Sequence, residues 1–80
     1  MHEKVEKYLQ SMCDKYDIGM TITKVNVDIF KVSWYNSEIE ISNTFRYDEE
    51  LDILFIKNQY GFFVEDLSYK RNMNDTIADQ

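Results

Sequence analysis

The sequence contains no proline, two glycines and one cysteine among its 80 residues. The absence of proline removes the rigid turns and linkers that often separate domains. One cysteine excludes an internal disulfide framework and a four-cysteine zinc site. Two glycines are too few for a glycine-rich phosphate-binding loop, so nothing supports nucleotide binding. The sequence also lacks an apolar run of transmembrane length and a signal-peptide pattern, which favours a location in the reducing cytoplasm.

Histidine is as scarce as cysteine. His2 lies at the start of the chain, where a general base would lack fixed neighbours, so we expect it to be exposed. Cys13 falls on the apolar side of a predicted helix, which favours a buried thiol over a nucleophile. Residues 48–59 begin like a calcium loop, but Ile53 stands where the EF-hand pattern needs glycine and Gln59 where it needs glutamate. We therefore predict no enzyme, no metal and no cofactor, with catalysis by carboxylates alone as a minor alternative.

Basic side chains are outnumbered by acidic ones, nine to fifteen, which gives a net charge of −6. Because the lysines and arginines form no basic stripe, we predict no direct contact with nucleic acid. Apolar residues make up 44% of the chain and include five Phe, six Tyr and one Trp. They are enough to fill the core of one small domain, and no segment predicts contact with a membrane.

The first part of the chain predicts a helix over residues 2–18, because its apolar residues recur at the spacing of one helical face. They are Val5, Tyr8, Leu9, Met12, Cys13 and Tyr16. Gly19 follows where a left-handed residue ends many helices, so we assign it that role.

From Met20 onward the apolar residues alternate, as in a strand. The alternation changes phase near residues 28–30. One strand over residues 20–34 would be too long for so small a domain, so we expect a bulge or a break there.

A turn over residues 35–38 follows, because its Asn and Ser favour local hydrogen bonds to the backbone. This turn would place Trp34 opposite Ile39 and Val32 opposite Ile41, with all four side chains on one face.

Residues 48–57 fit either a strand or a short capped helix, and we favour the strand. The reason is that residues 58–61 make a natural turn into the β-rich residues 62–64. We divide the chain into one domain over residues 1–70 and a polar, flexible tail over residues 71–80.

These elements predict an α+β fold, with one N-terminal helix packed on an antiparallel β-meander of four to five strands. The side chains expected to face the helix are Ile39, Ile41, Phe45, Ile53, Phe55 and Val64. Those expected on the other face are Leu54, Ile56, Phe63, Leu67 and Tyr69. One helix covers only one face, so a partner or a second copy should cover the other. The expected oligomer interface consists of Leu54, Ile56, Phe63 and Tyr69.

Acidic residues concentrate in the middle of the chain. Residues 28–66 contain nine acidic and three basic side chains, whereas the other segments together are neutral. We interpret this excess as an exposed patch that docks onto a basic groove of a partner protein, the alternative being an ordinary solvated surface. The residues expected to contact the partner are Glu38, Glu40, Tyr47, Asp48, Glu49, Glu50, Asp52 and Tyr60.

Residue types with AT-rich codons (Phe, Tyr, Met, Ile, Asn and Lys) dominate the composition, whereas Gly, Ala, Arg and Pro are rare. In size, acidity and this composition the chain resembles phage-encoded inhibitors, including anti-CRISPR proteins, that occlude bacterial nucleic-acid machinery. The resemblance implies a partial DNA mimic in the bacterial host cytoplasm, bound to a nucleic-acid-processing or defence complex. We therefore predict a non-enzymatic inhibitor that binds a basic surface of a partner protein. The alternative is a homo-oligomeric structural or assembly protein, such as a homodimer, joined through the uncovered apolar face.

Overall fold

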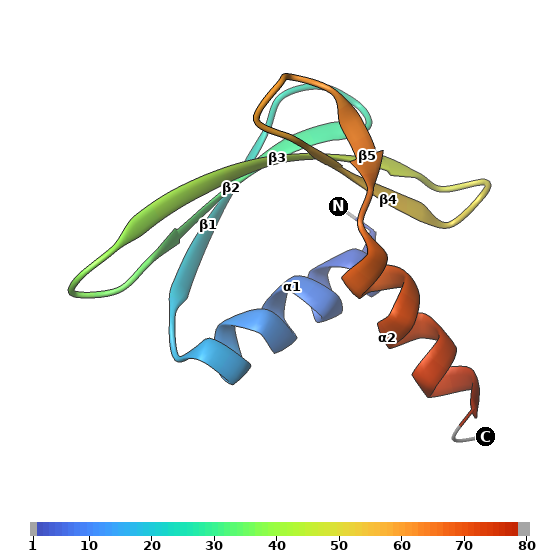
Figure 1. The fold of residues 1–80 in the computed structure, drawn as a ribbon, viewed down its shortest axis with the longest axis horizontal. Helices are drawn as coiled ribbons and strands as arrows, with labels where there is room; N and C mark the ends of the chain where they lie inside the picture. The colour runs from blue at the N-terminus through green and yellow to red at the C-terminus, as the bar shows by residue number, and fades with distance from the viewer. Residues whose placement is uncertain (1, 79–80) are drawn as a thin grey trace.

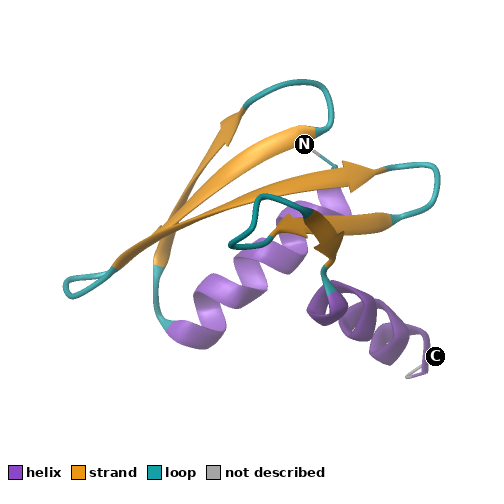
Figure 2. Cartoon of the chain, turned by 45° about the horizontal axis from the view of Figure 1, so that its top comes forward, coloured by secondary structure: helices purple, strands orange, loops and turns teal. Residues whose placement is uncertain are grey.

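The computed structural model describes residues 2–78, with side chains up to Asn72 (Figure 1). The elements in chain order are α1 (Glu3–Tyr16), β1 (Gly19–Lys24), β2 (Ile29–Tyr35), β3 (Glu40–Asp48), β4 (Ile53–Lys57), β5 (Phe63–Glu65) and α2 (Leu67–Ala78). The five strands form one antiparallel sheet in sequence order. Both helices lie on the same side of this sheet and leave its other face open (Figure 2). The predicted α+β fold, a helix on an antiparallel meander, is confirmed.

Helix α1 begins one residue later and ends two residues earlier than predicted, and polar residues cap both of its ends. His2 is the N-cap, and its Nδ1 accepts a hydrogen bond from the backbone N–H of Lys4 at 3.3 Å. At the other end Asp17 has a φ of 53° and takes the left-handed position. The role assigned to Gly19 is therefore wrong, because this glycine already belongs to β1. A Cβ at Gly19 would lie 2.6 Å from Cε2 of Tyr35, so glycine here permits close packing instead.

The break predicted near residues 28–30 is confirmed as a loop over residues 25–28. The side-chain oxygen of Asn26 accepts hydrogen bonds from the backbone N–H groups of Asp28 and Ile29, at 3.2 and 3.0 Å. This local turn ends β1 and reverses the chain into β2.

The hairpin between β2 and β3 closes one residue later than predicted. Asn36 accepts hydrogen bonds from the N–H groups of Glu38 and Ile39, so the loop covers residues 36–39. Trp34 consequently lies opposite Ile41, not Ile39, and Val32 lies opposite Asn43, not Ile41. A shift of two residues keeps each side chain on its predicted face, because the side-chain period of a strand is two.

Strand β4 confirms the strand interpretation, but its faces are inverted relative to the prediction. Leu54 lies opposite Tyr47 and Ile56 opposite Phe45, so both point toward the helices. Ile53 and Phe55, expected under the helix, consequently point to the open face. Because four consecutive residues of β4 are apolar, their alternation could not distinguish the two faces.

The last element is a helix, which the sequence did not predict. Asp66 accepts hydrogen bonds from the N–H groups of Ser68 and Tyr69 and so caps α2, which contains Leu67. Since α2 spans residues 67–78, the division at residue 70 does not match an element boundary. Residues 79–80 of the predicted tail lie outside the described residues.

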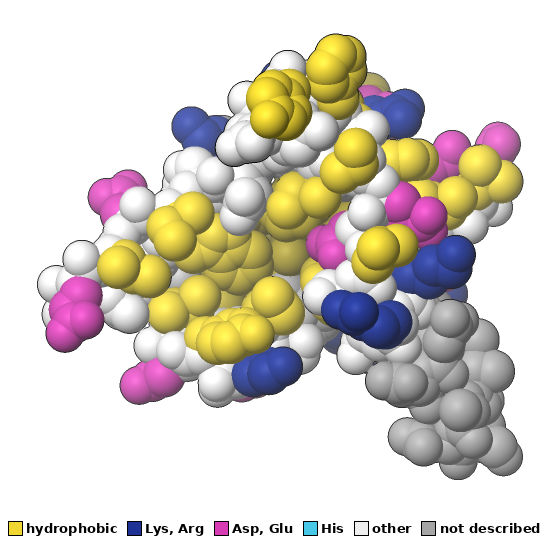
Figure 3. Space-filling model, viewed as in Figure 1, with side chains coloured by type: hydrophobic (Ala, Val, Ile, Leu, Met, Phe, Trp, Pro, Cys, Tyr) yellow, Lys and Arg dark blue, Asp and Glu magenta, His cyan; other side chains and the backbone are white. Residues whose placement is uncertain are grey.

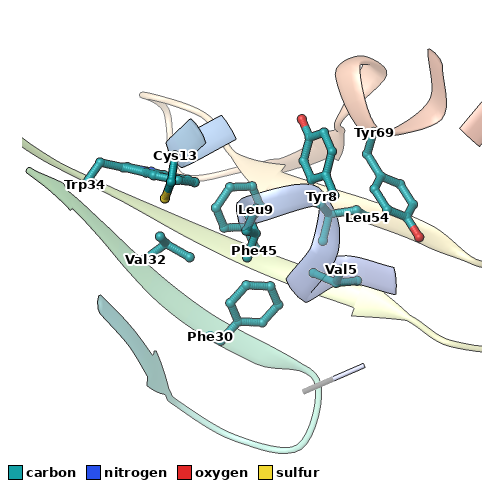
Figure 4. Packing of buried hydrophobic residues seen from close by; sticks show 10 residues of the cluster. All are labelled: Val5, Tyr8, Leu9, Cys13, Phe30, Val32, Trp34, Phe45, Leu54 and Tyr69. Carbon is teal, nitrogen blue, oxygen red and sulfur yellow. The ribbon is translucent and has the colours of Figure 1, made fainter. Parts of the chain in front are cut away.

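The core lies between α1, the middle strands and the first turn of α2 (Figure 4). Its fully or nearly buried side chains are Val5, Tyr8, Leu9, Cys13, Phe30, Val32, Trp34, Phe45, Leu54 and Tyr69. The expected burial of Cys13 is confirmed, and burial raises the pKa of its thiol.

Candidate interaction site

The acidic residues predicted to form one patch lie at two ends of the molecule. Glu38 and Glu40 belong to the β2–β3 hairpin, whereas Asp48, Glu49 and Glu50 lie at or just beyond the other end of β3. The eight steps of β3 separate the two groups by about 26 Å. In Figure 1 they occupy the left and right ends of the sheet. The prediction of one coherent patch is therefore wrong.

Asp52, another predicted contact residue, is part of the internal structure. Its Oδ1 accepts hydrogen bonds from the hydroxyls of Tyr47 and Tyr69, each at 2.6 Å. Its Oδ2 lies 3.5 Å from Nζ of Lys4. Burial opposes ionisation, but the two hydroxyls and the ammonium outweigh it and lower the pKa of the Asp52 carboxyl. Asp52 and Tyr47 thus join α1, the β3–β4 turn and α2.

The tyrosines of this region are held neutral. Burial and the hydrogen bond to Asp52 raise the pKa of Tyr47 to about 12, and burial and the same carboxylate raise the pKa of Tyr69. Tyr8 donates to Asp66 at 3.3 Å, and burial together with that carboxylate raises the pKa of Tyr8 to about 12. Their role is to fasten the two helices to the sheet and to each other.

Tyr60 lies away from the other predicted contacts. It is 76% exposed in the β4–β5 turn, at the opposite end of β4 from Asp52. The side-chain oxygen of Asn58 fixes this turn by accepting hydrogen bonds from the N–H groups of Tyr60 and Phe62. The structure therefore does not bring Tyr60 to either acidic end.

The acidic residues beyond β3 do line a cleft of about 670 Å³. Three separate segments supply its carboxylates, which are Glu6, Asp28, Asp48, Glu49 and Glu50. His2 lies in this cleft, with Nε2 3.9 Å from Oε1 of Glu49. Its side chain is 33% exposed, which is less than the sequence predicted. Among the side chains that the structure describes, up to Asn72, no group of His, Cys, Asp and Glu could hold a metal ion.

A second hollow, of about 330 Å³, is an apolar groove between α1 and the β2–β3 hairpin. Its main lining residues are Leu9, Met12, Tyr16, Trp34, Ile39, Ile41, Phe45 and Ile56. Trp34 and Phe45 are buried at its floor, whereas Ile39, Ile41 and Tyr16 on its walls are 46%, 52% and 55% exposed. Figure 3 shows these hydrophobic side chains as a continuous area across one face of the molecule.

The sequence prediction missed this groove because it placed Ile39 and Ile41 under the helix. Both side chains lie on the predicted face of the sheet, because they alternate with Glu40 and Ser42 on β3 and in the adjoining loop. Helix α1 has 14 residues and is only about 21 Å long. It therefore leaves the end of the long hairpin uncovered. Comparing the predicted length of the helix with that of the hairpin could have indicated the groove.

The four residues of the predicted oligomer interface do not share a surface. Leu54 and Tyr69 are 0% and 2% exposed in the core, and Ile56 packs against that core. Phe63 lies on the open face, under Arg46 and Lys57. One sheet face is open, as expected, but of these four residues only Phe63 lies on it.

Neither helix within residues 2–78 is long and apolar enough to span a membrane. Comparisons of the chain with protein-family models, with curated proteins and with solved structures gave no match.

Proposed function

We propose that this protein is a non-enzymatic binding protein that holds an apolar segment of a partner protein in the groove between α1 and the β2–β3 hairpin. The observation that carries the proposal is the half-exposed apolar wall over a buried aromatic floor. Contiguous exposed apolar surface of this kind is typical of interaction sites in small proteins.

The groove has the composition of an interface centre. Full burial of a Leu, Ile or Phe side chain contributes about 1.5–3 kcal/mol, so covering half-exposed Ile39, Ile41 and Tyr16 contributes about 1 kcal/mol each. Trp34 and Phe45 beneath them are rigid, because the Trp34 ring N–H donates to Asn43 at 2.9 Å and Phe45 stacks on Phe30. A rigid aromatic floor lowers the entropy lost on binding.

The charge of the protein indicates what surrounds the apolar segment of the partner. Glu38 adjoins Ile39 in the β2–β3 loop, and the whole chain carries a net charge of −6. Basic residues beside the docked segment would therefore speed association and add charge pairs at the rim. By covering a basic surface in this way the protein would inhibit a nucleic-acid-processing or defence complex of a bacterial cytoplasm.

The proposal is tested by selecting peptides from a random library on the folded protein and measuring their affinities by calorimetry. We expect selected peptides to combine apolar residues with Lys or Arg. Ile41→Asp should weaken their binding about tenfold or more. Ser42→Asp is the matched control, because the neighbouring side chain points to the opposite face of β3 and should change affinity less than twofold.

Charge reversal separates the two parts of the site. Glu38→Lys should weaken binding at low salt and reduce its salt dependence, while leaving the apolar contribution in place. If wild type and Ile41→Asp bind the selected peptides with equal affinity, the groove is not the binding site. If sedimentation shows that the wild type is a dimer and that Ile41→Asp is a monomer, the groove binds a second copy of this chain instead.

A further inference from the structure

The open face of the sheet carries basic and hydroxyl side chains, although the protein as a whole is acidic. One row crosses all five strands and consists of Thr23, Lys31, Thr44, Lys57 and Phe63. Thr44 and Lys57 adjoin one step beyond the pair formed by Phe45 and Ile56. Since neighbouring strands lie about 4.8 Å apart, Lys31 and Lys57 are separated by about 10 Å along this row.

Arg46 completes a triangle of cations around Thr44. It lies two residues from Thr44 on β3 and diagonally across from both lysines, at about 7–8 Å. These three residues are all the basic side chains of residues 28–66, and the register places every one of them on the open face. The sequence alone gave no sign of this, because the three are widely spaced along the chain.

The three cations have no acidic partner among the side chains that the structure describes. Ion pairs within 4 Å involve His2, Lys4, Lys7 and Lys70 instead. Two carboxylates share this face close by: Asp48 lies two residues from Arg46 on β3, where both line the acidic cleft, and Glu65 on β5 lies 3.9 Å from Nζ of Lys70. Neither lies within 4 Å of Lys31, Arg46 or Lys57. In a chain with an excess of acid, leaving three neighbouring cations unpaired favours an anionic ligand.

Aromatic rings accompany these cations. The guanidinium of Arg46 lies 4.6 Å from the ring centroid of Phe55 and 5.6 Å from that of Phe63, and Nζ of Lys57 lies 5.7 Å from Phe63. The Nε of Arg46 is buried without a hydrogen-bond partner in the described part of the chain. The rings therefore fix the guanidinium in place, with its terminal nitrogens left for a ligand.

The sequence shows no basic stripe and so predicted no contact with nucleic acid, but the strand register gathers three cations on one face. We propose that the open sheet face binds single-stranded nucleic acid, with phosphates at Lys31, Arg46 and Lys57 and a base stacked beside Phe63. An open antiparallel sheet with aromatic and cationic side chains suits splayed single strands, because every base has a face that can stack. The two helices lie behind the sheet, so no helix projects from this face into the groove of a duplex. This inference does not depend on the apolar groove, which lies on the opposite side of the sheet.

Fluorescence anisotropy of labelled single-stranded oligonucleotides of about 12 nucleotides, DNA and RNA, tests the inference on the full chain. Three phosphate contacts predict a slope of about −2 in a plot of log affinity against log salt concentration. Lys31→Ala and Lys57→Ala should each lower affinity about three- to tenfold at low salt and each reduce that slope by about 0.7. Lys15→Ala is the matched control, because this exposed lysine lies on α1, behind the sheet.

Phe63→Leu tests the stacking contact, since leucine keeps the apolar volume and removes the aromatic face. We expect it to weaken oligonucleotide binding about fivefold or more. Absence of binding at low salt, or equal losses in Lys31→Ala and Lys15→Ala, would overturn the inference. Tighter binding of duplex than of single strands, or equal binding of dextran sulfate with no effect of Phe63→Leu, would reduce the face to a general polyanion site. Ile41→Asp should leave oligonucleotide binding intact, so the two proposals can fail separately.

Discussion

Gly19 illustrates how one small residue decides where the sheet begins. Asp17 supplies the left-handed turn that ends α1, which leaves Gly19 free to start β1 directly opposite Tyr35. The Tyr35 ring lies over the space that a side chain at Gly19 would fill. At this position glycine is required by a contact across the strands, not by the backbone angle.

Gly19→Ala should destabilise the protein by about 1 kcal/mol, because the added methyl group overlaps the Tyr35 ring. Tyr35 is 43% exposed, so its ring can swing outward and limit the cost. In a Tyr35→Ala background the same change should be neutral or stabilising, since alanine loses less backbone entropy than glycine. A double-mutant cycle of urea unfolding measures the difference, and equal effects in the two backgrounds would refute this explanation.

Helix α2 depends on side chains outside its own sequence. Asp66 caps its first turn and also accepts the hydroxyl of Tyr8, while Tyr69 inserts into the core and donates to Asp52. These contacts come from α1 and from the β3–β4 turn. Tertiary contacts therefore position a helix whose own composition is mostly polar.

Asp66→Ala should lower the free energy of unfolding by about 1–2 kcal/mol and loosen α2 preferentially, because it removes the cap and the partner of Tyr8. Hydrogen exchange of the α2 amides, together with urea unfolding, checks this expectation. Asp66→Asn keeps an oxygen acceptor at the cap and should retain most of the stability. Equal exchange rates in wild type and Asp66→Ala would show that the cap does not hold the helix.

The elements differ in how far the sequence predicted them. Helix α1 and the loop over residues 25–28 could be predicted, because apolar spacing and the change in strand phase are local signals. The faces of β4 and the existence of α2 could not, since the first depends on the turn around Asp52 and the second on the burial of Tyr69. The hairpin register failed by two residues because one asparagine, Asn36, closes the loop later than expected.

At the scale of the whole molecule, the fold decides which charged side chains lie together. Carboxylates lie at both ends of the sheet, whereas Lys31, Arg46 and Lys57 share its open face. Counting charges along the chain predicted the excess of acid but not this arrangement, because residues distant in sequence become neighbours only through strand register. Of the eight expected partner contacts, three therefore lie at one end of the sheet and two at the other. Tyr47 and Asp52 belong to the internal structure, and Tyr60 lies apart in the β4–β5 turn.

The pH dependence of stability is also a property of the assembled fold. Asp52 has a lowered pKa, so its contribution is present at neutral pH and is lost as pH falls below about 4. Tyr8 and Tyr47 have pKa values raised to about 12, so their contribution is complete below about pH 10 and is lost as pH rises toward 12.

Unfolding midpoints measured across pH should therefore fall at both extremes. Tyr47→Phe should make the alkaline fall shallower, and Asp52→Asn should do the same for the acid fall, although both variants start less stable at neutral pH. Unchanged slopes in these variants would show that other groups control the pH response.

Trp34, the one tryptophan of the chain, lies at the floor of the apolar groove and is 8% exposed. Its indole is held to Asn43, so any occupant of the groove would change the surroundings of the ring without needing to move it. The protein consequently carries an intrinsic optical probe at that position. Shifts in its emission would report occupancy of the groove in unlabelled protein, and titration of the open sheet face would leave the emission unchanged.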